Sequence, residues 1–160
     1  MMAPLMHKVT ARLFERGISV LRFNFRGVGK SEGVHGGGID EIKDVQAAVD
    51  EAQPDAIAGW SFGAATALRW LAAASVPLPY AGIAPSPESL PPPEELPPSP
   101  KLIIVGDREQ VIDRVALEAY ARAAGADLVI QPGSDHFFYY REQVVADKMA
   151  DFLLANLTEV

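Results

Sequence analysis

One serine stands in a pattern typical of nucleophilic catalysis. The segment Gly59–Gly63 (GWSFG) fits G-x-S-x-G, and it links an apolar run to an alanine-rich stretch. A sharp turn from strand to helix strains the backbone at the serine and exposes its hydroxyl, and the flanking glycines avoid collisions. Ser61 is therefore the candidate nucleophile, and the N–H of Phe62 is the candidate donor to an oxyanion. The alternative is a glycine-rich turn in which Ser61 only caps the helix.

His136 is the candidate base for this serine. A neutral hydroxyl is a weak nucleophile and needs a base within hydrogen-bonding distance. His136 lies in the loop that follows the last expected strand, which agrees with the order Ser, acid, His along a hydrolase chain. Taken alone, it could be a solvated loop histidine. Together with Ser61 it indicates serine hydrolysis.

A carboxylate must orient the imidazole and stabilise its cationic form. The loop after the apolar strand KLIIV carries Asp107 and Glu109, and both qualify. Whichever of the two does not orient the imidazole is then an ordinary solvated charge in the loop. Residue types alone leave the choice between them open, because geometry decides it.

Two glycine-rich motifs suggest other sites. The segment 35–38 (HGGG) resembles a lipase oxyanion loop, but it follows a strand instead of preceding the first helix. It is read as a flexible connection, with a substitute donor loop as the alternative. The segment 27–31 (GVGKS) lacks the first glycine of a phosphate-binding loop, where Asn24 stands, and no helix begins at Lys30. Nucleotide binding is not expected.

The elements that position these residues alternate between strands and helices. Apolar spacing predicts a first helix with Leu5, Val9, Leu13 and Phe14 on one face, ended by Gly17. The expected strands are Ile18–Phe25, Asp55–Trp60, Tyr80–Ala84, Lys101–Val105 and Asp127–Gln131. The other expected helices are Ile39–Gln53, the run 61–75 with Arg69 as its only charge, Val111–Ala124 and Val144–Leu157. This order predicts an α/β fold of three layers, α/β/α, around a mostly parallel sheet of about five strands.

The 160 residues are expected to form a single domain. The segment 85–100 holds eight of the thirteen prolines, and it is read as a long loop within that domain. Neither a helix nor a strand ladder is expected there, and the segment is too short for a folded cap.

Composition narrows the class of partner. The formal charge of −7 without a basic patch argues against nucleic acid, and the absence of cysteine excludes thiolate chemistry and disulfides. The three histidines lie far apart, so no metal site is expected. No secretory signal or apolar run long enough to cross a bilayer is visible. The expectation is a cytoplasmic protein without a cofactor that acts on a small molecule and does not bind membranes; the sequence does not predict its oligomeric state.

Four segments resemble the small, cap-less α/β-hydrolases related to dienelactone hydrolases. They are Leu21–Gly33 (LRFNFRGVGKSEG), Gly59–Ala65 (GWSFGAA), Leu102–Val111 (LIIVGDREQV) and Ser134–Phe138 (SDHFF). In that family the acid stands in G-D-x-D-x-x-V, so the resemblance implies that Glu109 is the acid, here a glutamate where the family has an aspartate. Asp107 remains the alternative.

The resemblance also implies what is missing. Relatives begin with strands before the first helix, and a loop after one of them provides the second oxyanion donor. This chain begins just inside that loop, at Met1–Met6, so an N-terminally truncated fold is expected. The function expected is a serine hydrolase, of the carboxylesterase kind, acting on a small ester or thioester. The alternative is a non-catalytic or vestigial binding domain with an incomplete oxyanion hole.

Overall fold

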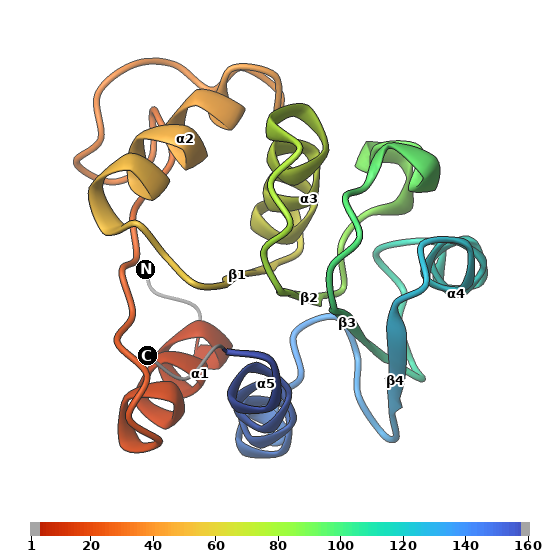
Figure 1. The fold of residues 1–160 in the computed structure, drawn as a ribbon. Helices are drawn as coiled ribbons and strands as arrows, with labels where there is room; N and C mark the ends of the chain where they lie inside the picture. The colour runs from red at the N-terminus through yellow and green to blue at the C-terminus, as the bar shows by residue number, and fades with distance from the viewer. Residues whose placement is uncertain (1–3, 158–160) are drawn as a thin grey trace.

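The computed structural model describes residues 4–157, and its centre is a parallel sheet (Figure 1). The strands are β1 (Ile57–Trp60), β2 (Tyr80–Ile83), β3 (Lys101–Gly106) and β4 (Asp127–Gln131). They lie in the order β1-β2-β3-β4, all parallel, so their carboxyl ends meet at one edge. In a sheet of this kind, that edge is where a functional site is expected.

Within residues 4–157, five α-helices cover the sheet on its two faces, as predicted for three layers (Figure 1). Helices α1 (Pro4–Glu15) and α5 (Glu142–Asn156) pack together on one face, over an apolar core that includes Ile83 and Ile104. Helices α2 (Glu41–Ala52), α3 (Phe62–Ala74) and α4 (Arg114–Ala123) lie on the other face, over a second core that includes Tyr80. None of the described helices is long and apolar enough to cross a membrane.

Residues 18–25 do not form the predicted strand, so the described sheet has four strands instead of about five. The segment runs between α1 and α2, apart from β1, and no described strand lies between the two (Figure 1). An extended segment without a neighbouring strand has no ladder of hydrogen bonds, whatever its β propensity. Leu21 and Phe23 are accordingly 50% and 42% exposed, although their types suit a buried strand.

Smaller differences have local causes. Phe14 is 76% exposed, because only Leu5, Val9 and Leu13 of α1 face the core. The helix α4 begins at Arg114, not Val111, because the Asp113 carboxylate accepts a hydrogen bond from the N–H of Ala116 and caps the helix there.

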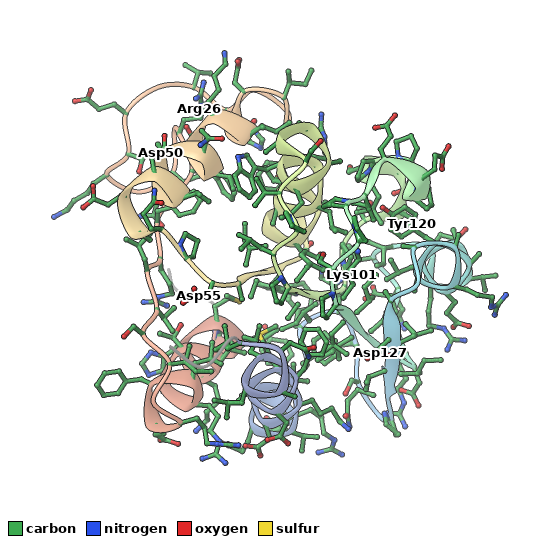
Figure 2. The ribbon with its side chains drawn as sticks, in the orientation of Figure 1. Arg26, Asp50, Asp55, Lys101, Tyr120 and Asp127 are labelled. Atoms are coloured by element: carbon green, nitrogen blue, oxygen red, sulfur yellow. The ribbon has the colours of Figure 1, made fainter. Side chains whose placement is uncertain are left out.

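The proline-rich segment 85–100 contains two short 3₁₀ turns, Pro87–Ser89 and Pro93–Glu95. Proline fixes the backbone angle that starts such a turn, so the segment has more local structure than predicted. It is attached to α4 by Tyr120, which Figure 2 labels; the Tyr120 hydroxyl donates to the carbonyl of Pro91 at 2.8 Å.

Candidate active site

Ser61 lies at the sharp turn between β1 and α3, as predicted. Its backbone angles, φ 50° and ψ −116°, are strained for a residue with a side chain. The N–H of Ser61 donates to the carbonyl of Ile83 at 2.7 Å, which ties the turn to β2. A Cβ on Gly59 would lie 2.6 Å from the nitrogen of Ala64, so only glycine permits the helix to start this close to the strand.

His136 lies in the loop between β4 and α5, and its Nε2 is 3.0 Å from the Ser61 hydroxyl oxygen. The side chain is 5% exposed. Its backbone is held from two directions. The indole N–H of Trp60 donates to the His136 carbonyl at 3.2 Å, and the Asp135 carboxylate accepts hydrogen bonds from the N–H groups of Phe137 and Phe138. The imidazole is therefore fixed beside the serine.

Glu109 contacts the other side of the same imidazole. Its Oε2 is 2.9 Å from His136 Nδ1, and its side chain is fully buried. The second oxygen, Oε1, accepts hydrogen bonds from the N–H groups of Val111 and Ile112 at 2.7 and 3.3 Å. A carboxylate held at both oxygens can orient the ring and stabilise its cation.

Asp107 has a different position. Its Oδ1 accepts a hydrogen bond from the N–H of Ser134 at 3.1 Å, so it joins the β3 loop to the histidine loop without touching the imidazole. Hydrogen bonds from the N–H groups of Gly133 and Ser134 hold the pKa of the Asp107 carboxyl below its usual value, against the opposing effect of partial burial. Gly106 permits this junction, because a Cβ there would overlap the Ser134 carbonyl oxygen.

The backbone N–H of Phe62 lies at the N-terminal turn of α3, next to the serine. The first N–H groups of a helix have no acceptor within the helix, so this one can donate to an oxyanion. The part of the chain expected to supply a second donor, Met1–Met6, lies partly outside the described residues. Its described part belongs to α1 from Pro4 onward.

Glu41 engages two of the three glycine N–H groups in the segment 35–38, the alternative location for that donor. The N–H groups of Gly36 and Gly38 each donate to a carboxylate oxygen of Glu41 at 2.7 Å. His35 Nδ1 lies 3.0 Å from the nitrogen of Gly37 and 2.6 Å from Oε1 of Glu41. The N–H groups of Gly36 and Gly38 are occupied by Glu41, so neither is free to act as the substitute oxyanion donor.

Glu41 is a site residue that sequence reasoning missed. It is the first residue of α2 and is fully buried, and it is also 2.6 Å from His35. Burial would raise the pKa of the Glu41 carboxyl, but the backbone N–H donors and His35 outweigh it and hold that pKa below its usual value. A carboxylate in the first turn of the helix expected after three glycines was the available signal, since a helix N-terminus favours a negative charge.

A cavity of about 120 Å³ opens directly beside Ser61. The loop residues Gly37 and Gly38 line one side of it, Phe62 and Arg69 of α3 another, and Ser86 a third. Arg69 is the second residue that sequence reasoning left without a role. A larger cavity of about 400 Å³ lies elsewhere, between residues 21–32 and α2, and Ser61 does not line it.

Aromatic side chains surround His136. The ring centroids of Trp60 and Phe137 lie 5.8 and 5.5 Å from that of the imidazole, and Phe137 stacks on Tyr139 at 5.7 Å. Phe137 and Tyr139 are 44% and 54% exposed. This partly exposed aromatic surface lies beside the imidazole and can contact a bound molecule.

The described residues contain no group of three or more acidic, histidine or cysteine side chains that could hold a metal ion. What they bring together is a hydroxyl, an imidazole and a carboxylate in one hydrogen-bonded line. Such a line can remove a proton from the hydroxyl and store the resulting positive charge on the imidazole.

Known proteins are similar to this chain in sequence and in architecture. Residues 3–98, which include Ser61, match the family described as serine aminopeptidase, S33. The uncharacterized protein RP471 of Rickettsia prowazekii is 29% identical over 164 residues, covering 89% of this chain and 67% of its own.

Two solved structures are similar over nearly the whole chain. A serine hydrolase without a lid from Xanthomonas campestris is 28% identical with a TM-score of 0.88, covering 100% of this chain and 77% of its own. An α/β serine hydrolase homologue from Coxiella burnetii is 29% identical with a TM-score of 0.74, covering 98% of this chain and 77% of its own.

Proposed function

The chain belongs to the serine aminopeptidase S33 family of α/β hydrolases, and from that premise we propose that it hydrolyses a small ester or thioester. In the proposal Ser61 is the nucleophile, His136 the general base and acid, and Glu109 the orienting carboxylate. The observation that carries it is the continuous pair of hydrogen bonds, 3.0 Å from Ser61 to His136 and 2.9 Å from His136 to Glu109.

The proposed reaction has two halves. His136 Nε2 accepts the proton of Ser61 as its oxygen attacks the substrate carbonyl, and the Phe62 N–H donates to the oxyanion. The same proton then passes from His136 to the departing alcohol or thiol as the bond to the carbonyl carbon breaks. An acyl group remains on Ser61. Water, deprotonated by His136, releases it as an acid and restores the serine hydroxyl.

Glu109 acts on the imidazole in both halves. Its hydrogen bond from Nδ1 leaves Nε2 free as the acceptor that faces Ser61, and its charge stabilises the imidazolium. The side chains of Glu109 and His136 are almost inaccessible to water, so solvent screens the interaction between them poorly.

The family takes its description from an aminopeptidase, but the cavity favours an ester or thioester here. An aminopeptidase must hold a free ammonium group near the nucleophile. The charged side chain that lines the cavity beside Ser61 is the guanidinium of Arg69, which repels an ammonium. The other residues of the lining are glycine, alanine, serine, threonine and phenylalanine, none of which carries a charge.

Labelling with a fluorophosphonate probe tests the proposal, because only a base-activated serine reacts at phosphorus. We expect one adduct on Ser61, located by mass spectrometry, and none in Ser61→Ala. Hydrolysis of p-nitrophenyl butyrate and of a butyryl thioester should follow the same pattern. Folded protein, shown by circular dichroism, that takes no label on Ser61 and cleaves neither substrate would refute the proposal and favour a binding domain without catalysis.

A further inference from the structure

We propose that Arg69 forms an anion subsite and that the preferred substrate carries a carboxylate at the far end of its acyl part. This inference rests on the proposed function and names the substrate class for the same site. It follows from where the guanidinium lies, from its lack of a partner, and from the half of the substrate that this side of Ser61 must receive.

Arg69 and Ser61 line the same small cavity. Both belong to one face of α3, because residues four apart on a helix lie above one another and Ala65, between them, lines the cavity as well. The guanidinium lies against the glycine loop, since a Cβ on Gly38 would be 2.9 Å from its Nη1 and 3.5 Å from the Phe62 ring. The cation therefore faces the space beside the nucleophile.

Within residues 4–157 the Arg69 side chain makes no hydrogen bond or ion pair. Of the two carboxylates that follow the glycine loop, Asp40 pairs with Lys43. Glu41 is already engaged by two glycine N–H groups and His35. Glu88 of the opposite loop is exposed and accepts the hydroxyl of Ser86. A half-buried guanidinium with all of its donors available, in a chain of net charge −7, is an unusual feature that a bound anion would explain.

The cavity must receive the acyl half of the substrate. The leaving group has to lie near His136, which returns the proton to it, and the cavity lining does not include His136 or its aromatic neighbours. The lining does include Phe62, whose N–H faces the carbonyl oxygen. The part of the substrate that stays bonded to Ser61 is thus the part that extends toward Arg69.

The helix sets the length of that acyl chain. Ser61 and Arg69 are eight residues apart, about 12 Å along the axis, and helical side chains slant toward the N-terminus, which brings the guanidinium closer to Ser61. The cavity of about 120 Å³ is small compared with ordinary ligand pockets. Short dicarboxylic half-esters, such as monomethyl glutarate and monomethyl adipate, match both limits.

The test compares kcat/KM for monomethyl glutarate with that for its neutral counterpart, methyl butyrate, by titration of the released acid. We expect wild-type protein to prefer the anionic ester by about 10-fold or more, because a hydrogen bond to a charged group contributes more than a neutral one. Arg69→Gln should bring the ratio close to one, and Arg69→Lys should retain part of it. Arg122→Gln, on the exposed surface of α4, is the matched control and should keep the wild-type ratio.

A second readout does not depend on turnover. Calorimetry should detect glutarate binding to Ser61→Ala but not to the same protein carrying Arg69→Gln. An unchanged ester ratio in folded Arg69→Gln, or glutarate binding that does not depend on Arg69, would overturn the subsite while leaving the hydrolase proposal intact. Glutarate binding that depends on Arg69 in a protein whose Ser61 takes no label would overturn the hydrolase proposal and leave the anion subsite supported.

Discussion

The two flanks of Ser61 are built in different ways. On one flank, β2, β3 and β4 pair along their full lengths, and the loops at their carboxyl ends carry Glu109 and His136. On the other flank, residues 18–38 have no strand, and side chains hold them. Arg26 contacts Asp44 through its backbone N–H and its guanidinium, and Glu41 holds the glycine loop (Figure 2 shows Arg26 beside α2).

This difference separates two tasks. A ladder of backbone hydrogen bonds places the proton-transfer residues with little freedom, because each strand is fixed by its neighbour. Carboxylates that hold a loop can be removed one at a time by mutation or by acid. The first flank should therefore respond to changes in position or volume, and the second to changes in charge.

The largest effect is expected on the paired flank, from Glu109→Gln. The amide cannot stabilise the imidazolium and can impose the wrong tautomer on His136, so turnover of p-nitrophenyl butyrate should fall by about 10² to 10⁴-fold. Asp107→Asn is the matched control, because Asp107 contacts only the backbone of the histidine loop. The turnover of Asp107→Asn should fall by only a few-fold. The reverse ranking would assign the acid role to Asp107.

A methyl group on the same flank should produce the largest loss of stability. In Gly106→Ala the new Cβ collides with the Ser134 carbonyl, and backbone on both sides must move. We expect the thermal midpoint to fall by about 10 °C or the protein not to accumulate in folded form.

Gly37→Ala is the counterpart on the other flank. Gly37 has φ +66° but open space around its Cα, so the cost is only backbone strain and the midpoint should fall by about 2 to 6 °C. Equal losses in the two variants would show that the junction at Gly106 adapts, and would remove the contrast in rigidity.

Charge should matter on the second flank. Glu41→Gln keeps the size of the side chain but turns one acceptor into a donor that faces a glycine N–H, which leaves buried groups unsatisfied. The thermal midpoint should fall by about 3 to 8 °C. Asp40→Asn, at the adjacent and more exposed carboxylate, should change it by less than about 2 °C. A Glu41→Gln variant with an unchanged thermal midpoint would mean that packing, and not the charge of Glu41, holds the loop.

The sequence predicted the paired flank well, for identifiable reasons. Strands such as Lys101–Gly106 are short apolar runs, and Ser61 and His136 stand in turns that their neighbours define. The choice between Asp107 and Glu109 followed from the family pattern, and the structure places Glu109 against His136 while Asp107 faces the backbone of Ser134. Residue types could not decide this, because the direction of a side chain in a loop depends on backbone turns that residue types do not fix.

The other flank was predicted poorly because its structure depends on partners. The strand propensity of residues 18–25 is real, but propensity produces a strand only where a neighbouring strand supplies the ladder. Glu41 was expected only as a member of the helix Ile39–Gln53, and its burial follows from its hydrogen bonds to the glycine loop, which hydrophobic periodicity does not predict. Arg69 was noted as the only charge on α3, yet its proposed role depends on a cavity formed by loops whose positions the sequence does not predict.

The smallest effect should come from acid acting on the Arg26 and Asp44 pair, which is only partly buried. The hydrogen bonds from the Arg26 guanidinium hold the pKa of the Asp44 carboxyl below its ordinary value of 3.8, against a weaker effect of burial. A carboxylate whose pKa is lower in the folded protein stabilises the fold at pH values above its unfolded pKa. That contribution disappears as the pH falls through the folded pKa.

Wild-type protein and Asp44→Asn should therefore differ in thermal midpoint by about 1 to 3 °C at pH 7, and the difference should shrink below about pH 4. The comparison must use the difference between the two midpoints at each pH. The pKa values of Asp40, Glu41 and Asp107 are also lowered, so protonation of these carboxylates destabilises both proteins equally in acid. Asp50→Asn on the exposed surface of α2 serves as the control and should show no such dependence. A difference that stayed constant from pH 7 to pH 3 would show that the asparagine variant loses packing and not charge, and the two flanks would then differ less than their hydrogen bonds indicate.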